Sequence, residues 1–516
     1  MPIQRRVTWT AVQTVVLARL VSKTLGLSGY ILTVDVGSSS IRCSLYDETG
    51  GLVGGTGASF RHRFTSTRDG GATLDADELC ELTFKAIDET LIHARDKAKS
   101  VVGVALSTFW HSVLGVDQRG LPTTPILTWA DRRAAGAAEE LRGRLDEGTI
   151  HRRTGCVLHS SYLPAKLLWL SRSFPKAFEE SERFLSPGEY LYLRLFGETH
   201  VGTSMASGTG LFDQNRKAWD EKLLDTLPVG ESQLSPISNE PSRGLRGEWA
   251  RRWPALTDVP WFPAAGDGAC SNVGSGCTER ERLALMVGTS GAMRILWKAD
   301  SVRVPDGLWC YRSDAKRFVS GGALSDGGNL VAWLRQTLRL PKPEETEKLL
   351  SEMEPDAHGL TFLPLLAGER GPAWADEANG TVVGLSMATQ PVEILRAAME
   401  AVALRFALIA ERLDKAFPEG PSGSQVIATG GGLVGSPAWI WIMADTLGRP
   451  VIASAIAEAS ARGAALLALE ALGGPPVEEV EAPLDKVYEP DLSHYAVYKE
   501  ALNRQRKLYD AVIHKD

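Results

Sequence analysis

The chain contains the same strand–turn–strand pattern twice, once around Gly37 and once around Gly288. In each copy an apolar segment runs into glycine and hydroxyl residues, and a segment with alternating apolar positions follows. Glycine lets a backbone approach an anion closely, and successive N–H groups with hydroxyls hold phosphate oxygens. One copy alone is typical of an ordinary hairpin with a Ser/Gly turn. The repetition predicts two similar domains that grip one polyphosphate between them.

Two acidic residues lie at the ends of predicted strands. Asp35 precedes the first turn, where a carboxylate can hold Mg²⁺ against nucleotide phosphates or simply cap the turn. Asp267 stands between Gly266 and Gly268, which we expect to leave its carboxylate accessible. Such a carboxylate can accept the proton of an alcohol during phosphoryl transfer. A Gly-Asp-Gly turn is the equally supported alternative, and both interpretations stay open on spacing alone.

Composition restricts the class of protein. A chain of 516 residues is too long for one core, so two large domains are expected. The net charge of −7 gives no electrostatic reason to expect nucleic acid as the main partner. The six cysteines contain no C-x-x-C pair, which argues against structural zinc and a disulfide scaffold and favours a reducing compartment. No segment approaches the roughly 20 apolar residues of a membrane helix, so no membrane partner is expected.

Periodicity places the main elements. Helices are predicted over residues 75–96 with Asp75 or Asp77 as cap, 391–417, 437–447 with Pro437 at its start, 460–472, and a terminal helix over 487–512. Strands are predicted over 101–107, 318–322, 360–364 and 425–429. The first 34 residues contain no Asp or Glu, which resembles a weak transit peptide or a disordered extension.

A third glycine-rich segment follows the strand over 425–429. Gly430, Gly431, Gly432 and Gly435 satisfy the literal G-x-G-x-x-G pattern of dinucleotide-binding proteins. The pattern lies late in the chain, and no clear βαβ unit with an acidic residue follows it. We therefore favour a turn that makes room for a purine and ribose at a helix start.

Aromatic and polar residues follow two further strands. Trp110 and His111 form one such group, and Trp129, Asp131 and Arg132 form the other. Open α/β sheets bind ligands at strand ends, where aromatic rings stack on sugars and His or Arg binds hydroxyl or carboxylate groups. The alternative is a core tryptophan beside a helix start with solvated arginines, and for Arg133 this alternative is favoured.

Together, in this order, the motifs resemble those of the FGGY carbohydrate kinases, which have the sugar kinase/actin/Hsp70 fold. The resemblance spans residues 30–510 and rests on the two turns, on the glycine-rich segment up to Ser436 and Pro437, and on the Trp110 and Trp129 groups. It implies an α/β fold of two ribonuclease-H-like domains with a nucleotide cleft between them. The implied division is an extension (1–29), an N-terminal domain (30–275), a C-terminal domain (276–475) and a helical tail (476–516).

The resemblance also implies a role for each matching residue. Asp267 falls on the family's catalytic aspartate, and Asp35 is the expected Mg²⁺ site. The acceptor is expected at Trp110, His111, Trp129, Asp131, Arg132 and Asp267. ATP is expected at Gly37, Ser38, Ser39, Arg42, Gly288, Thr289, Ser290, Gly328, Gly430, Gly431, Gly432 and Ser436. Two departures stand out, because many relatives have Met at the position of Trp110 and Lys at that of Arg42.

Within the family, the segments 366–374 and 321–329 look most like gluconokinases, with Trp374 and the paired glycines as the telling residues. The expected reaction is phosphorylation of D-gluconate to 6-phosphogluconate, with Arg63, His111 and Arg132 as candidate cations for its carboxylate. A xylulokinase-like pentulose kinase is the first alternative, and an actin- or Hsp70-like ATPase and a dinucleotide-dependent oxidoreductase follow. We expect a cytoplasmic enzyme, with organelle import and a homodimer left open.

Overall fold

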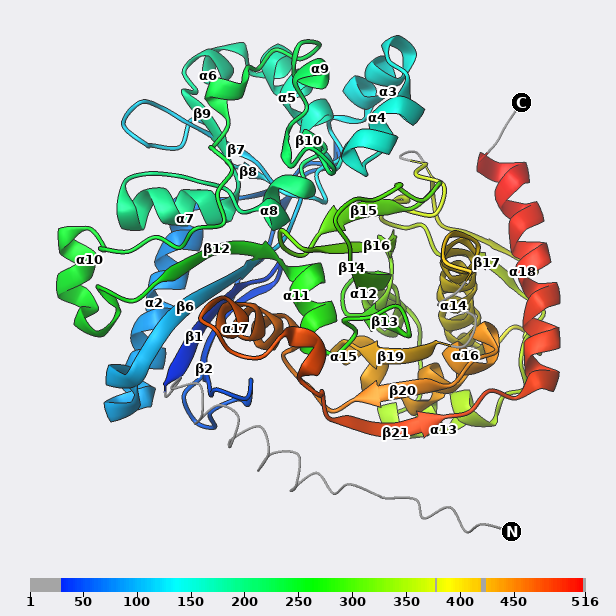
Figure 1. The fold of residues 1–516 in the computed structure, drawn as a ribbon. Coiled ribbons are helices and arrows are strands. Elements are labelled where there is room, and N and C mark those ends of the chain that lie inside the picture. Colours follow the sequence, from blue (N-terminus) through cyan, green and yellow to red (C-terminus); the bar gives the residue numbers. More distant parts are fainter. Residues whose placement is uncertain (1–28, 376–377, 419–423, 514–516) are drawn as a thin grey trace.

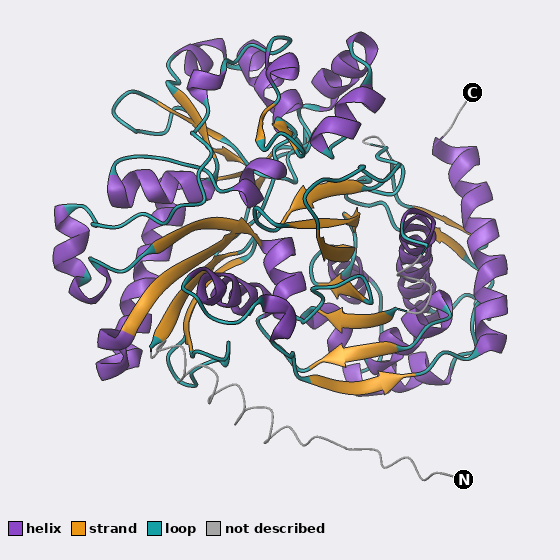
Figure 2. Cartoon of the chain, viewed as in Figure 1, coloured by secondary structure: helices purple, strands orange, loops and turns teal. Residues whose placement is uncertain are grey.

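The computed structural model of the chain describes residues 29–375, 378–418 and 424–513. Within them the chain forms two lobes, each built on a β-sheet with helices packed against it (Figures 1 and 2). The predicted extension over residues 1–29 lies outside the described residues except for Gly29. Among the described helices, none combines the length and the apolar character needed to cross a membrane.

The first lobe contains a five-stranded sheet in the order β12-β6-β1-β2-β3. Its strands are β1 (Tyr30–Val36), β2 (Ser40–Tyr46), β3 (Ala58–Arg61), β6 (Val101–Thr108) and β12 (Trp261–Gly266). β1 and β2 form the predicted hairpin, and β1, β6 and β12 run parallel. The C-terminal ends of these three strands therefore meet at one edge, which is where Asp35, Trp110 and Asp267 lie.

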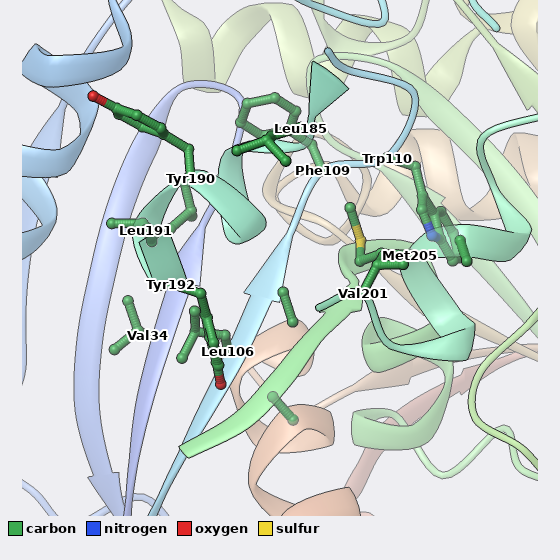
Figure 3. Packing of buried hydrophobic residues seen from close by; sticks show 14 of the residues in the cluster. Val34, Leu106, Phe109, Trp110, Leu185, Tyr190, Leu191, Tyr192, Val201 and Met205 are labelled. Atoms are coloured by element: carbon green, nitrogen blue, oxygen red, sulfur yellow. The ribbon is translucent and has the colours of Figure 1, made fainter. Parts of the chain in front are cut away.

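Two helices that pack on this sheet follow from their sequences. α2 (Ala76–Ala94) packs against β2 and β3, and Asp75 caps it by accepting the N–H of Glu78 at 2.8 Å. This confirms the helix predicted over residues 75–96. α7 (Pro187–Phe196) packs on β6 and β12, and Figure 3 shows its Tyr192 beside Leu106 of β6.

Between β6 and β12 the chain leaves the sheet and forms a helical region, which lies at the top of Figure 1. Besides α7 it contains α3 (Ala135–Arg144), α4 (Glu147–Thr154), α5 (Leu163–Ser173) and α8 (Thr203–Ser207). Two short strands, β7 (Leu114–Val116) and β8 (Ile126–Leu127), follow β6 in the sequence and precede α3. This region supplies one wall of the site described below.

The second lobe contains a seven-stranded sheet in the order β15-β16-β14-β13-β19-β20-β21. Its strands are β13 (Arg282–Val287), β14 (Gly291–Lys298), β15 (Trp309–Arg312), β16 (Arg317–Leu324), β19 (Gln425–Thr429), β20 (Val451–Ser454) and β21 (Leu484–Tyr488). β13 and β14 form the second predicted hairpin. Its helices include α12 (Gly328–Thr337), α13 (Pro343–Glu352), α14 (Pro391–Ala416), α15 (Gly431–Val434) and α16 (Pro437–Leu447), and α14 and α16 confirm two predicted helices.

The tail is not helical throughout, so the prediction of one helix over 487–512 is wrong at its start. Leu484–Tyr488 is instead β21, which pairs with β20 as an edge strand of the second sheet. Pro490 then separates this strand from α18 (Leu492–Ile513), since proline disfavours helix in the residue before it.

The two lobes are interlocked by α17 (Ala459–Ala471), which comes from the second half of the chain. It packs against β1 and β6 of the first sheet and against α11 (Asp267–Gly274). The backbones of α17 and α11 touch directly, because a Cβ added at Gly463 of α17 would lie 1.8 Å from the carbonyl oxygen of Cys270 in α11. Alanines and leucines of α17 therefore belong to the hydrophobic core of the first lobe.

Candidate active site

A cleft between the lobes brings the two hairpin turns and the predicted acceptor residues together. Its lining from the first lobe includes Asp35, Gly37, Ser38, Ser39, Arg42, Trp110, His111, Trp129, Tyr162 and Asp267. Its lining from the second half of the chain includes Met286, Gly288, Thr289, Ser290, Arg294, Tyr311, Arg370 and Trp374. The predicted juxtaposition of the two turns at one cleft is thus present in the structure.

The first turn places a buried carboxylate at the cleft. Asp35 pairs with Arg42 across β1 and β2, and Arg42 Nη1 lies 3.7 Å from Asp35 Oδ2 and 3.2 Å from Glu458 Oε2. Burial raises the pKa of Asp35 to about 7, and the neighbouring charge of Asp267 adds to this rise. Within the described residues, Asp35 Oδ1 and the Ser107 hydroxyl both lack a hydrogen bond of good geometry.

These features fit a divalent cation. The Asp35 carboxylate is buried, has one oxygen without a hydrogen-bond partner among the described residues and lies close to the carboxylate of Asp267. Hard cations such as Mg²⁺ bind oxygen ligands of this kind, usually through one or two carboxylates with the rest supplied by water and phosphate. Asp35 is therefore the residue that could hold Mg²⁺ at this cleft.

The second turn is neutral and is supported by glycines. Gly288 itself has room, because a Cβ added there would meet only Met286 Sδ, at 3.6 Å. Behind it, a Cβ at Gly328 would lie 2.3 Å from the oxygen of Gly288, and one at Gly430 would lie 2.5 Å from that of Val287. These glycines are required by close backbone packing behind the turn, which leaves the turn itself facing the cleft.

The other residues of the glycine-rich segment have different surroundings. Gly432 also packs behind the turn, since its Cβ would lie 3.0 Å from the oxygen of Val287, whereas a Cβ at Gly431 would meet no atom within 4 Å. Ser436 caps α16 by accepting the N–H of Trp439 at 3.3 Å, and its hydroxyl donates to Glu347. Ser436 thus has a structural role, and a contact with nucleotide stays a prediction.

Asp267 is the first residue of α11, at the end of β12. Its Oδ1 accepts the N–H of Gly268 at 2.7 Å. Burial raises the pKa of its carboxyl, and the nearby guanidinium of Arg294 opposes this rise. Arg294 comes from β14 of the second hairpin, and sequence reasoning assigned it no role. Its Nε donates to Asn272 Oδ1 at 2.9 Å, and its Nη2 lacks a partner among the described residues.

The glycines beside Asp267 serve a purpose that sequence analysis did not foresee. A Cβ at Gly266 would lie 1.8 Å from Trp110 Cε2, and one at Gly268 would lie 2.8 Å from Trp110 Cζ3. A Cβ at Gly208 would also lie 2.6 Å from the indole. The flanking glycines thus also make room for the ring of Trp110, which is only 6% exposed, while Asp267 itself lines the cleft.

His111 begins an aromatic wall on the acceptor side of the cleft. Its backbone has a φ of 61°, a strained value for a non-glycine residue. Its Nδ1 hydrogen-bonds to the Gly208 oxygen at 2.5 Å, and burial lowers the pKa of the ring to about 3, so the imidazole is neutral. Tyr162 and Tyr311 belong to the same wall, and their hydroxyl groups form a hydrogen bond of 2.5 Å across the two lobes. The ring of Trp374 lies 5.9 Å from that of Tyr162, measured between centroids.

The predicted Asp131 and Arg132 do not reach this wall. Asp131 is buried, pairs with Arg133 at 2.5 Å and accepts the N–H of Ala72 at 3.1 Å. Arg133, which sequence analysis favoured as solvated, is therefore an ion-pair partner. Arg132 and Arg63 line an adjoining hollow that shares Trp129 and Arg370 with the cleft.

Two cations near the wall were missed by sequence reasoning. Arg370 lies over the ring of Trp129, with 4.2 Å between the guanidinium carbon and the ring centroid, and its Nε has no partner among the described residues. Lys166 is buried behind the wall on α5. Arg370 lies in the gluconokinase-like segment 366–374, but its place over Trp129 could not be predicted because the two residues are far apart in the sequence. Lys166 lies in no motif that the sequence analysis singled out.

Comparisons with known proteins agree with this geometry. The model of the FGGY family of carbohydrate kinases, N-terminal domain, matches residues 30–274, and that of the C-terminal domain matches residues 283–472. A gluconokinase of Bacillus subtilis is 27% identical over 87% of this chain and 88% of its own length.

Two solved structures from Lactobacillus acidophilus have the same fold. One is a ligand-bound xylulose kinase, with a TM-score of 0.85 and 28% identity, and the other a gluconate kinase, with a TM-score of 0.85 and 27% identity. Each comparison covers 94% of this chain and 98% of the other.

The chain therefore belongs to the FGGY family of carbohydrate kinases and is an ATP-dependent phosphotransferase with the two-domain fold of that family. Membership confirms the predicted fold and enzyme class. It sets aside the actin- or Hsp70-like ATPase and the dinucleotide-dependent oxidoreductase. The glycine-rich pattern after β19 is accordingly not a dinucleotide fingerprint, because in this fold it packs behind the second turn.

Proposed function

We propose that this FGGY carbohydrate kinase transfers the γ-phosphoryl group of ATP to a primary hydroxyl of a sugar acid, and that D-gluconate is this acceptor. The observation that carries the proposal is the cleft itself: Asp267 shares it with the two glycine-rich turns and with an aromatic wall that contains a partly exposed guanidinium. The product would be 6-phosphogluconate.

Each part of the cleft has a role in this reaction. The N–H groups of the turns at Gly37 and Gly288 bind phosphate oxygens from the two lobes. Asp35 would hold Mg²⁺, which neutralises phosphate charge when bound. Asp267 accepts the hydroxyl proton of the acceptor while its oxygen bonds to the γ-phosphorus and the bond to ADP breaks. Its raised pKa makes it a better proton acceptor than an ordinary aspartate.

Arg370 supports a carboxylate-bearing acceptor. Among the described residues it forms no ion pair, and the one hydrogen bond recorded for it, from Nη2 to the Leu324 oxygen, is long at 3.4 Å. A guanidinium held over an aromatic ring and short of partners is well arranged to bind a carboxylate through two N–H groups. We therefore place the gluconate carboxylate at Arg370 and not at the earlier candidates, because the His111 imidazole is neutral and Arg63 and Arg132 line the adjoining hollow.

A pentulose kinase acting on xylulose is the second candidate. It is favoured by the likeness to the xylulose kinase of L. acidophilus, which equals the likeness to the gluconate kinase in TM-score. In that case Arg370 would bind hydroxyl groups, and its charge would give no preference for an acid.

Cytoplasmic location also belongs to the proposal. It is supported by the six cysteines, all of which are free and buried, as expected in a reducing compartment.

ATP turnover with gluconate, xylulose, ribulose, glycerol and glucose tests the acceptor. We expect the highest kcat/KM with gluconate, and we expect Arg370→Gln to lower it by about 10- to 100-fold, as loss of a charged hydrogen bond does. The same variant should change kcat/KM for neutral acceptors far less. Arg132→Gln, in the adjoining hollow, is the matched comparison. A higher kcat/KM with xylulose than with gluconate would contradict the proposal.

A further inference from the structure

Lys166 is a buried lysine without a carboxylate partner. It lies in α5 and is 1% exposed, and among the described residues no ion pair involves it. Instead its Nζ donates to the carbonyl oxygens of His111, at 2.5 Å, and Thr128, at 2.7 Å. Burial lowers the pKa of the ammonium to about 7, with Asp131 opposing the change from a distance.

The two carbonyls belong to the two segments that carry the aromatic wall. One segment presents Trp110 and His111 to the cleft, and the other presents Trp129. Val113 and Leu127 join these segments by a pair of backbone hydrogen bonds of 3.1 and 2.8 Å. Among the described residues, no further backbone hydrogen bond joins the two segments on the side of His111 and Thr128. Lys166 donates to one carbonyl of each segment, so it bridges the two segments and pairs both buried oxygens.

A second tether lies at the start of the same helix. Ser161, just before α5, donates its hydroxyl to the carbonyl oxygen of Trp129 at 3.1 Å. The consecutive carbonyls of Thr128 and Trp129 are therefore both held from α5, by Lys166 and Ser161. Tyr162, the residue after Ser161, forms a hydrogen bond through its hydroxyl group with Tyr311 of the second lobe. The start of α5 and the residues just before it thus contact the His111 and Trp129 segments and Tyr311.

Burying an ammonium in this way costs free energy that an apolar side chain of the same length would not cost. Stability alone therefore does not explain why a lysine lies here. The backbone of His111 offers an explanation, because a non-glycine residue in the left-handed conformation persists only where its surroundings hold it, and Lys166 holds the His111 carbonyl.

We propose that Lys166 is a positioning residue for the acceptor, which holds the His111 and Trp129 segments at the separation that sugar binding requires. The proposal rests on the proposed function, in that a sugar is taken to bind between these segments. Lys166 does not line the cleft, so it acts through the two segments and not by touching substrate.

Lys166→Met keeps the apolar stem and removes both donors. We expect the KM for the acceptor to rise about tenfold or more, with the KM for ATP changed less than about twofold, since only the acceptor wall depends on these bonds. Lys176→Met, at a lysine of the same lobe whose side chain is 90% exposed, is the matched control and should leave both KM values unchanged.

Lys166→Ala gives a second test, because propylamine matches the part of the side chain that this variant removes. Adding propylamine should restore acceptor KM in Lys166→Ala and not in Lys166→Met, where the space is filled. Unchanged acceptor KM in a folded variant would overturn the proposal. Equal losses of ATP and acceptor affinity, or loss of the fold, would show a purely structural role and would overturn it as well.

Failure of the proposed function would look different. Wild-type protein would then show a higher kcat/KM with another acceptor than with gluconate, and the KM values of the Lys166 variants would be measured with that acceptor. Activity on any one of them is sufficient for the test of Lys166, whichever acceptor is preferred.

Discussion

The two hairpins have the same shape and different chemistry. In the first, Val36 pairs with Ile41 next to the turn, and Asp35 with Arg42 one step further back. In the second, Val287 pairs with Gly291, and the next pair is Met286 with Ala292. The positions that carry a carboxylate and a guanidinium in one lobe therefore carry a thioether and a methyl group in the other.

The difference shows that the two copies of the hairpin contribute different chemical groups to the cleft. Both turns offer backbone N–H groups, so we propose that phosphate binding is shared between the lobes. Charge is not shared, because Asp35 and Asp267 both lie at the strand ends of the first sheet. Within the described residues, the cation that the second hairpin contributes to the cleft is Arg294, which lies further from the turn and next to Asp267. Predictions that separate charge from backbone test this division.

The largest effect is expected from Asp267→Asn. The variant keeps the shape of the side chain and cannot accept the acceptor's proton, so kcat should fall by about 10²- to 10⁴-fold while the KM for ATP changes little. Steady-state kinetics with a verified acceptor measures this. Asp96→Asn, at a side chain that is 94% exposed, is the control. Near wild-type kcat in Asp267→Asn would show that the proton leaves by another route.

Asp35→Asn should alter the dependence on Mg²⁺, because the first hairpin alone carries a carboxylate next to its turn. We expect the Mg²⁺ concentration for half-maximal rate to rise about 10- to 100-fold, the range seen when support for a metal site is lost. Met286→Leu changes the matching position of the second hairpin and should leave this concentration unchanged. Equal effects of the two changes would break the comparison between the hairpins.

Gly288→Val tests the neutral turn. Its Cβ would meet only Met286 Sδ, at 3.6 Å, so the variant should fold, and the new side chain would stand where phosphate approaches. We expect the KM for ATP to rise about tenfold, the loss that corresponds to about 1.4 kcal/mol of binding. Gly328→Val is the contrasting variant, since its Cβ would clash with the Gly288 backbone and lower the melting temperature. An unchanged KM in folded Gly288→Val would contradict this placement of ATP.

The smallest effect is on stability. Burial raises the pKa of Asp35 to about 7 in the folded protein, against about 3.9 in unfolded chains. The folded state holds this proton more tightly, so the stability it contributes is present at low pH and lost as pH rises towards 7. Without metal or nucleotide, the melting temperature of Asp35→Asn minus that of wild type should therefore grow from pH 4 to 7, by about 2–4 °C, and then level off. Calorimetry across this range measures it, and a difference independent of pH would contradict it.

Much of the fold could be predicted from local patterns. The hairpins, α2, α14 and α16 follow from strand alternation, caps and an apolar stripe, all of which lie within a few residues of one another. The tail was less predictable, because β21 becomes a strand by pairing with β20 and not by its own pattern. The reason for Gly266 and Gly268 was also hidden, since the ring that requires them belongs to Trp110.

By itself the sequence predicted which segments would bind phosphate and which aspartate would take a proton, because glycine, hydroxyl and acidic residues at strand ends act through neighbouring backbone. Only the tertiary structure decided that Arg294 faces Asp267, that Arg370 covers Trp129 and that Lys166 joins two segments of the acceptor wall. The physical reason is range. A turn is built from adjacent residues, whereas the charge around a substrate is set by side chains that packing alone brings together.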